Sequence, residues 1–216
     1  MTFCLDSVII KPKNGIEIKN AIILLHGYGG DGKDISILSL NWKRHLPNTI
    51  FICPDGPEQC LVNPSGFQWF DLTKDDPKYI LQESINAEKK LNQFIDEVKD
   101  KFSLEKNKIC LSGFSQGCMM SINIGLTSSQ EYNCIVGFSG KIINQEDLRL
   151  RKKVSTKTLL IHGDSDQVVS PSFLLEAKDF YIRNNISIET HLINNCDHHI
   201  PTEASSIALK YILKKL

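Results

Sequence analysis

The chain has 216 residues, of which 41% are hydrophobic and 23% are charged. This length suits one domain with a single buried core, so we expect residues 1–216 to fold as one unit. Basic and acidic side chains balance at 25 each, which excludes a strong overall attraction to nucleic acid or to an anionic membrane. A short basic run, Arg149–Lys153, has the composition of a solvated surface.

The sequence gives no sign of export or of a membrane anchor. Its N-terminal segment, MTFCLDSVIIKPKNG, lacks the basic stretch and long apolar run of a secretory signal. The longest apolar run, Ala21–Leu25, is too short to cross a bilayer. Seven scattered cysteines without a C-x-x-C pair argue against both a disulfide framework and a zinc site. We therefore expect a cytoplasmic protein whose thiols are reduced and buried.

Short apolar runs alternate with helical patterns along the chain. Seven runs rich in Ile, Leu and Val predict strands, and most are continuous, as in strands covered on both faces. In chain order they are residues 7–10, 21–26, 49–53, 108–113, 134–139, 158–163 and 187–193. Apolar residues with helical spacing predict helices at residues 77–102, about 170–181 and 201–216. This alternation predicts an α/β fold with a mostly parallel, doubly covered sheet.

One long irregular segment, Pro54–Asp76, interrupts this alternation. A loop of this length inside a compact domain is usually functional, and ligands of such sheets bind beyond the strand ends. The chain is too short to add a large cap domain to the core. We therefore expect this segment, which we call the rim loop, to supply most of the wall of an open or partly roofed site.

The turn after residues 21–26 reads LLHGYGGDGKDI and permits three functional interpretations. Its glycines have the G-x-G-x-x-G spacing of a dinucleotide site, and Asp55 follows the next strand. They also approach a phosphate loop, but Asp34 stands where a hydroxyl should hold magnesium and would repel the phosphates. A His-Gly turn can instead direct backbone N–H groups at an oxyanion. In a plain turn the glycines would only supply positive φ angles.

The stretch KICLSGFSQGCMMSINIG predicts a strand, a G-x-S-x-G motif and a helix. This motif places its serine on a strained turn between strand and helix, where flanking glycines allow tight packing. The turn pushes the Ser115 hydroxyl out of the sheet, next to a helix N-terminus that favours negative charge. Ser115 is therefore the candidate nucleophile.

Two aspartates and two histidines follow later strands in an order that suits a serine triad. A serine hydroxyl needs a base to remove its proton, and the base needs an acid to orient it. In hydrolases with this type of sheet, the chain order is nucleophile, acid, histidine. Asp164 and Asp166 follow residues 158–163, and His198 and His199 follow the next strand.

Together, LHGYGGDGKD, GFSQG, HGDSDQVV and the terminal HHI resemble the phospholipase/carboxylesterase family of small serine α/β-hydrolases, which includes the acyl-protein thioesterases. The resemblance spans nearly the whole chain and implies an α/β-hydrolase fold. It implies that Ser115 is the nucleophile, Asp166 the acid and His198 the base. It also implies that the backbone N–H groups of Tyr28 and Gln116 bind the oxyanion.

The neighbours of these residues receive other roles. Adjacent side chains in an extended loop point in roughly opposite directions, so only one of the two histidines should face Ser115. The family's closing motif is Gly-His, often before an aliphatic residue, which favours His198 and leaves His199 at the rim. Asp197 replaces the glycine, and Asp164 is expected to shape its turn.

The predicted reaction transfers an acyl group to water and needs no metal or organic cofactor. Its substrate would be a small or lipid ester or thioester, including an acylated protein. Trp69 and Phe70, in a segment similar to the family's Trp-Phe-Asp loop, are candidates to contact the acyl chain, or else they anchor the rim loop in the core. A non-catalytic binding protein of this fold and a dinucleotide-binding oxidoreductase are the alternatives. Acyl-chain length and oligomeric state do not follow from the sequence.

Overall fold

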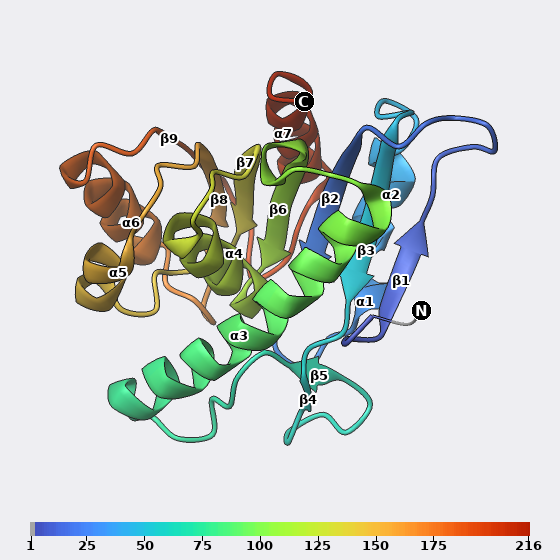
Figure 1. The fold of residues 1–216 in the computed structure, drawn as a ribbon. Helices are drawn as coiled ribbons and strands as arrows, with labels where there is room; N and C mark the ends of the chain where they lie inside the picture. Colours follow the sequence, from blue (N-terminus) through green and yellow to red (C-terminus); the bar gives the residue numbers. More distant parts are fainter. Residues whose placement is uncertain (1–2) are drawn as a thin grey trace.

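The sheet is built from the apolar runs of the sequence. In a computed structural model, which describes residues 3–216, seven strands form one sheet in the order β1-β3-β2-β6-β7-β8-β9. These strands are β1 (Ser7–Ile10), β2 (Asn20–Leu25), β3 (Thr49–Pro54), β6 (Ile109–Phe114), β7 (Cys134–Phe138), β8 (Thr158–Gly163) and β9 (Ile188–Ile193). Only the pairing of β1 with β3 is antiparallel within this described sheet. The predicted mostly parallel sheet is confirmed (Figure 1).

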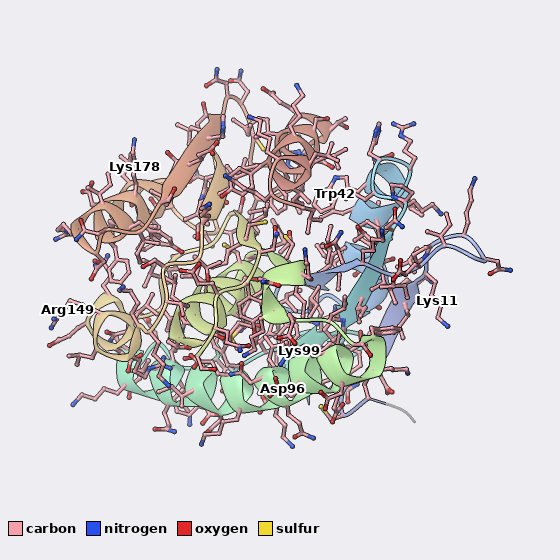
Figure 2. All side chains as sticks on the ribbon, turned by 45° about the horizontal axis from the view of Figure 1, so that its top comes forward. Lys11, Trp42, Asp96, Lys99, Arg149 and Lys178 are labelled. Atoms are coloured by element: carbon pink, nitrogen blue, oxygen red, sulfur yellow. The ribbon has the colours of Figure 1, made fainter. Side chains whose placement is uncertain are left out.

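Helices cover both faces of the sheet, which explains why its central strands are continuously apolar. One face carries α3 (Pro77–Phe102), α4 (Gln116–Thr127), α5 (Gln145–Arg151) and α6 (Ser172–Arg183). The other carries α1 (Gly32–Ile35), α2 (Ile37–Trp42) and α7 (Thr202–Leu213). In Figure 2, Trp42 lies between α2 and α7, where its Nε1 donates to Ser205 Oγ at 3.0 Å. The exposed Lys178 and Arg149 project outward.

The long helix α3 matches its predicted bounds because the sequence marks both ends. Asp76 caps it by accepting hydrogen bonds from Lys78 N and Tyr79 N, and Pro77 occupies the first turn. The helix ends at Ser103, which adopts a left-handed conformation. The helix expected from residue 170 begins later, at Ser172, because Ser170 and Pro171 form a turn before it.

Several elements differ from the sequence-based expectation. Helices α1, α2 and α5 were not predicted, because four to seven residues are too few to show a helical period. The rim loop contains a small hairpin of β4 (Glu58–Gln59) and β5 (Phe67–Gln68). Strand β9 is largely exposed because it lies at the edge of the sheet.

Arg151 corrects the interpretation of the basic run as a solvated surface. Its guanidinium lies 2.7 Å from Glu88 on α3 and 2.7 Å from Asp147 on its own helix. The hydrogen bond to Glu88 is the main cause of the raised pKa of Arg151. One residue of the run therefore joins α5 to α3, whereas Arg149 is exposed.

All seven cysteines are free, and six of them are buried while Cys4 is exposed. Among residues 3–216, no helix combines the length and the apolar composition needed to cross a bilayer.

Candidate active site

Ser115 stands on a strained turn between β6 and α4. Its backbone has φ 53° and ψ −115°, a combination that a non-glycine residue rarely adopts and that costs about 1–3 kcal/mol. Two hydrogen bonds help to hold it, from Ser115 N to Phe138 O at 2.8 Å and from Met119 N to Ser115 O at 3.1 Å. The predicted strand-turn-helix context of this serine is thus present.

The two glycines of the motif are required by close backbone contacts. A Cβ atom on Gly113 would lie 2.3 Å from the backbone of Gly117. A Cβ atom on Gly117 would lie 2.2 Å from Leu25 O and 2.6 Å from His26 O. Glycine at these positions therefore lets α4 begin directly against β6 and against the end of β2.

Ser115, His198 and Asp166 form a continuous hydrogen-bonded chain. His198 Nδ1 lies 2.7 Å from Asp166 Oδ2, and His198 Nε2 lies 3.0 Å from Ser115 Oγ. Because an ionised carboxylate only accepts hydrogen bonds, Nδ1 carries the proton and Nε2 is left to accept the serine proton. The structure thus brings together the serine, aspartate and histidine that the family resemblance implied.

Asp166 is buried and fully hydrogen-bonded. Its other oxygen, Oδ1, accepts from the backbone N–H groups of Val168 and Val169, each at 2.9 Å. Burial raises the pKa of Asp166, but the hydrogen bonds from His198 and from these two amides outweigh it, so the pKa lies below its ordinary value. The carboxylate therefore remains ionised at neutral pH.

The neighbouring acidic and basic residues are not part of this hydrogen-bonded chain of three side chains. Asp164 Oδ1 accepts from Ser165 Oγ at 2.7 Å and shapes the turn. His199 Nδ1 pairs with Asp197 on the exposed side of the loop. Asp197 is not among the residues with positive φ, whereas Asn195 has φ 53°. The loop therefore needs no glycine at position 197, where the family motif has one.

A third histidine, His162, contacts the same aspartate and was not selected from the sequence. Its Nε2 lies 2.8 Å from Val169 O and 3.3 Å from Asp166 Oδ2, so this N–H is shared between the two oxygens. Burial is the main cause of the lowered pKa of His162. The sequence could have identified His162, because it is a polar residue at the end of the apolar run TLLIHG.

The turn after β2 is fixed by a neutral histidine. His26 Nδ1 lies 2.7 Å from Gly27 O, which can only accept, so Nδ1 carries a proton. His26 Nε2 accepts from Gly56 N at 2.8 Å. Burial lowers the pKa of His26, and protonation of Nε2 would set it against the Gly56 N–H.

Two backbone N–H groups near Ser115 remain available. Within residues 3–216, the N–H groups of Tyr28 and Gln116 donate to no protein acceptor. The segments that carry them pack together, because a Cβ on Gly27 would lie 3.3 Å from Ser115 Cβ. The two predicted oxyanion donors therefore lie on segments that pack against each other at Ser115.

The Gln116 side chain holds the rim loop. Its Oε1 accepts from Trp69 N at 2.9 Å, and its Nε2 donates to Phe70 O at 2.7 Å. Trp69 Nε1 also donates to His26 O at 3.0 Å. The nucleophile turn, the His-Gly turn and the rim loop are therefore connected by side-chain hydrogen bonds.

These contacts correct the proposal that Trp69 and Phe70 contact an acyl chain. Each side chain is only 1% exposed and belongs to the core between α3 and the sheet. The alternative interpretation, that both anchor the rim loop, is the one that their burial supports. The exposed apolar side chains of this loop are Leu61 and Val62, each 67% exposed, and Leu72 at 39%.

The glycine turn does not form a nucleotide site. Helix α1 has four residues, and its first N–H, on Gly32, donates to Asp55 Oδ1 at 2.7 Å. Asp31 caps the same helix. Carboxylates therefore occupy the N-terminus that a pyrophosphate would need. Among residues 3–216, no three His, Cys, Asp or Glu side chains gather as a metal site would require.

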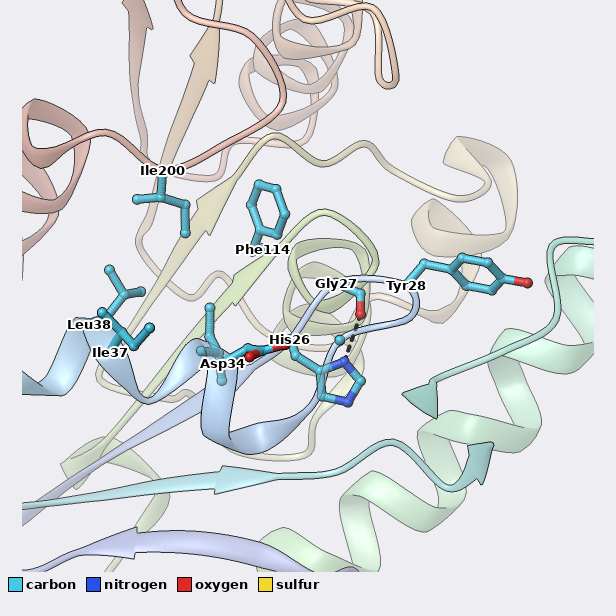
Figure 3. A pocket seen from close by; sticks show the side chains of 10 residues that line it. His26, Gly27, Tyr28, Asp34, Ile37, Leu38, Phe114 and Ile200 are labelled. Carbon is cyan, nitrogen blue, oxygen red and sulfur yellow. Dashed lines mark hydrogen bonds between the residues drawn. The ribbon is translucent and has the colours of Figure 1, made fainter. Parts of the chain in front are cut away.

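An apolar pocket of about 340 Å³ lies beside the His-Gly turn. Figure 3 shows Ile37 and Leu38 from α2 on one side and Phe114 and Ile200 facing them. The Phe114 ring lies 4.8 Å from the His198 ring, centroid to centroid. The pocket therefore lies against the segments that carry Ser115 and His198.

A sheet of this order with a serine turn, a His-Gly turn and a histidine after the last strand defines an α/β-hydrolase. Residues 6–216 match the phospholipase/carboxylesterase family, and the chain belongs to it. Both the predicted fold class and the predicted family are confirmed.

Known relatives are esterases and thioesterases. The chain is 27% identical to acyl-protein thioesterase 1 of Schizosaccharomyces pombe over 202 residues, which cover 88% of this chain and 86% of the relative. The crystal structure of esterase PE8 has a TM-score of 0.94 and 31% identity, covering 98% of this chain and 99% of that one. Acyl-protein thioesterase 2 of Zea mays, with a TM-score of 0.75, 22% identity and coverage of 97% and 98%, shares the fold.

Proposed function

We propose that this protein is a serine hydrolase that cleaves carboxylic ester or thioester bonds through an acyl-enzyme on Ser115. The observation that carries the proposal is the aligned chain of Ser115, His198 and Asp166, with contacts of 3.0 and 2.7 Å. A histidine oriented in this way by a buried carboxylate can serve as a general base toward the serine hydroxyl. Membership of the family supports the same reaction class.

In the first half of the reaction, Ser115 Oγ attacks the acyl carbon while His198 Nε2 takes its proton. Asp166 holds the imidazole orientation and stabilises the imidazolium that forms. The Tyr28 and Gln116 N–H groups donate to the oxyanion, aided by the N-terminus of α4. His198 then gives its proton to the departing oxygen or sulfur.

In the second half, water replaces the leaving group. His198 accepts a proton from this water, which attacks the acyl carbon, and the collapse of the second intermediate returns the proton to Ser115 Oγ. The residues of the chain account for every proton transfer.

The substrate class is a small or lipid ester or thioester, with an acylated protein included. The similarity to acyl-protein thioesterases and to an esterase supports this range. Leu61, Val62 and Leu72 are the exposed apolar residues of the rim loop, and we assign the acyl-binding surface to them. Free cysteines fit the reducing conditions of the cytoplasm, where we place the protein.

A fluorophosphonate probe tests the nucleophile directly. Labelling of the folded protein should disappear in Ser115→Ala and persist in Ser206→Ala, a matched change at an exposed serine on α7. Absence of labelling in the folded protein would reject catalysis and favour a non-catalytic binding protein. A series of p-nitrophenyl esters of increasing acyl length, compared with a palmitoyl thioester by kcat/KM, then identifies the preferred acyl group.

A further inference from the structure

The apolar pocket beside the His-Gly turn has no role in the reaction described so far. Its apolar wall combines α1 and α2 with the end of β6 and the segment after His198, through Ile35, Ile37, Leu38, Phe114 and Ile200. In Figure 3, Ile37, Leu38, Phe114 and Ile200 surround a shared space. Its volume, about 340 Å³, falls at the lower end of the range of small-molecule sites.

The pocket borders the segments that carry the reacting groups, on the side of His198. Phe114 immediately precedes Ser115, and its ring packs against His198 at 4.8 Å. Ile200 lies two residues beyond His198. On the opposite wall, Gly27 and Tyr28 belong to the turn that supplies the oxyanion contact.

The geometry of the tetrahedral intermediate assigns an occupant to this pocket. Its carbon carries Ser115 Oγ, the oxyanion, the acyl group and the leaving group. The leaving oxygen or sulfur must lie within hydrogen-bond reach of His198 Nε2, because this atom protonates it as its bond to carbon breaks. The leaving group therefore extends on the side lined by Phe114 and Ile200, while the rim loop lies on another side, over the Gln116 side chain.

We propose that this pocket binds the alcohol or thiol part of the substrate and that it selects a neutral, apolar leaving group. This inference rests on the proposed function. The pocket is walled by aliphatic and aromatic side chains, and Asp34 is the acidic residue among those that line it. His26 also lines it but is held neutral by its hydrogen bonds. A phosphate or another anionic group on the leaving side would meet a carboxylate and no compensating cation there.

Acetate esters that differ only in the alcohol test this assignment. Ethyl, 2-phenylethyl and 2-sulfoethyl acetate all form the same acetyl-enzyme, so differences in kcat/KM report acylation and leaving-group binding. We expect kcat/KM for 2-phenylethyl acetate to exceed that for ethyl acetate by roughly 10- to 100-fold, as for other apolar pockets. The value for 2-sulfoethyl acetate should lie below that for ethyl acetate.

Two exposed isoleucines give a matched pair of variants. Ile37, at the pocket, is 63% exposed, and Ile182, on α6, is 58% exposed, so neither change should disturb the core. Ile37→Ser should reduce the preference for 2-phenylethyl over ethyl acetate by about 3- to 10-fold, and Ile182→Ser should leave it unchanged. Asp34→Asn should raise kcat/KM for 2-sulfoethyl acetate several-fold, more at low than at high salt.

The proposal is overturned if kcat/KM for ethyl and 2-phenylethyl acetate differs by less than about twofold. It is also overturned if Ile37→Ser and Ile182→Ser change the preference equally. Labelling by a small fluorophosphonate separates a failure of the pocket assignment from a failure of the proposed hydrolase activity. If it labels Ser115 but the alcohol preference is missing, the pocket assignment fails and the hydrolase remains. If it does not label the folded protein, the proposed function itself fails.

Discussion

Two aspartate–histidine pairs meet where the loops after β8 and β9 end the sheet, with the same functional groups in opposite environments. Asp166 is fully buried and His198 is 18% exposed, whereas Asp197 and His199 are 76% and 56% exposed. The buried pair is held by two valine amides and ends at Ser115 Oγ. The exposed pair ends in solvent. The contrast shows that hydrogen-bonded context and exclusion of water, rather than residue type, make one pair suitable for catalysis.

The largest expected effect comes from removing each histidine in turn. His198→Ala should lower kcat by about 10⁶-fold, because the serine loses its base and the triad acts as a unit. His199→Ala should change kcat less than threefold, since its ring pairs only with an exposed aspartate. Steady-state hydrolysis of a p-nitrophenyl ester measures both. The reverse ranking would mean that the motif is shifted by one residue.

Replacing each aspartate by asparagine tests which of the two orients the His198 imidazole. Asp166→Asn should lower kcat by about 10⁴-fold, because an amide N–H facing His198 Nδ1 would favour the wrong tautomer. Asp197→Asn should have little effect on the same assay. Equal losses in the two variants would contradict the assignment of Asp166 as the orienting acid.

His162, the third histidine of the site, affects how the free energy of unfolding depends on pH. Burial lowers the folded-state pKa of His162 below its unfolded value near 6.5. The unfolded state therefore binds more protons as the pH falls below about 6.5, and the free energy of unfolding decreases until the folded-state pKa is reached. This group contributes at most about 1.4 kcal/mol per pH unit in that interval.

Urea denaturation between pH 7 and pH 5 measures this slope. His162→Gln, which keeps a donor near Val169 O but cannot titrate, should flatten it. Buried His26, whose pKa is also lowered, supplies a similar slope that this variant retains. An unaltered slope in His162→Gln would show that this histidine is not held neutral.

The smallest expected effect concerns the exposed pair itself. Asp197→Gly restores the family's glycine but removes an exposed ion pair, which contributes about 0–1 kcal/mol. Because the positive φ in this loop belongs to Asn195, glycine at position 197 relieves no strain. The free energy of unfolding should therefore change by less than about 1 kcal/mol. A gain of 2 kcal/mol or more would indicate strain at Asp197.

Much of the fold was predictable because it depends on local patterns. Continuous apolar runs marked the doubly covered strands, and the Asp76-Pro77 cap marked the start of α3. The Gly-x-Ser-x-Gly motif predicted the turn at Ser115 because its two glycines meet backbone atoms that exclude any side chain. Helices of one or two turns were missed, since so few residues carry no periodicity.

The sequence by itself determined the order of strand, serine, aspartate and histidine, and with it the family. The motif favoured His198, but only the tertiary structure shows that its ring faces Ser115, because this depends on the path of the loop after β9. It also decided that Trp69 and Phe70 anchor the rim loop, since burial arises from contacts with α3 and the sheet. The pocket likewise exists only where α2, β6 and the segment after His198 converge. Contacts between distant segments arise from packing, and the spacing of residues along the chain does not reveal which segments will touch.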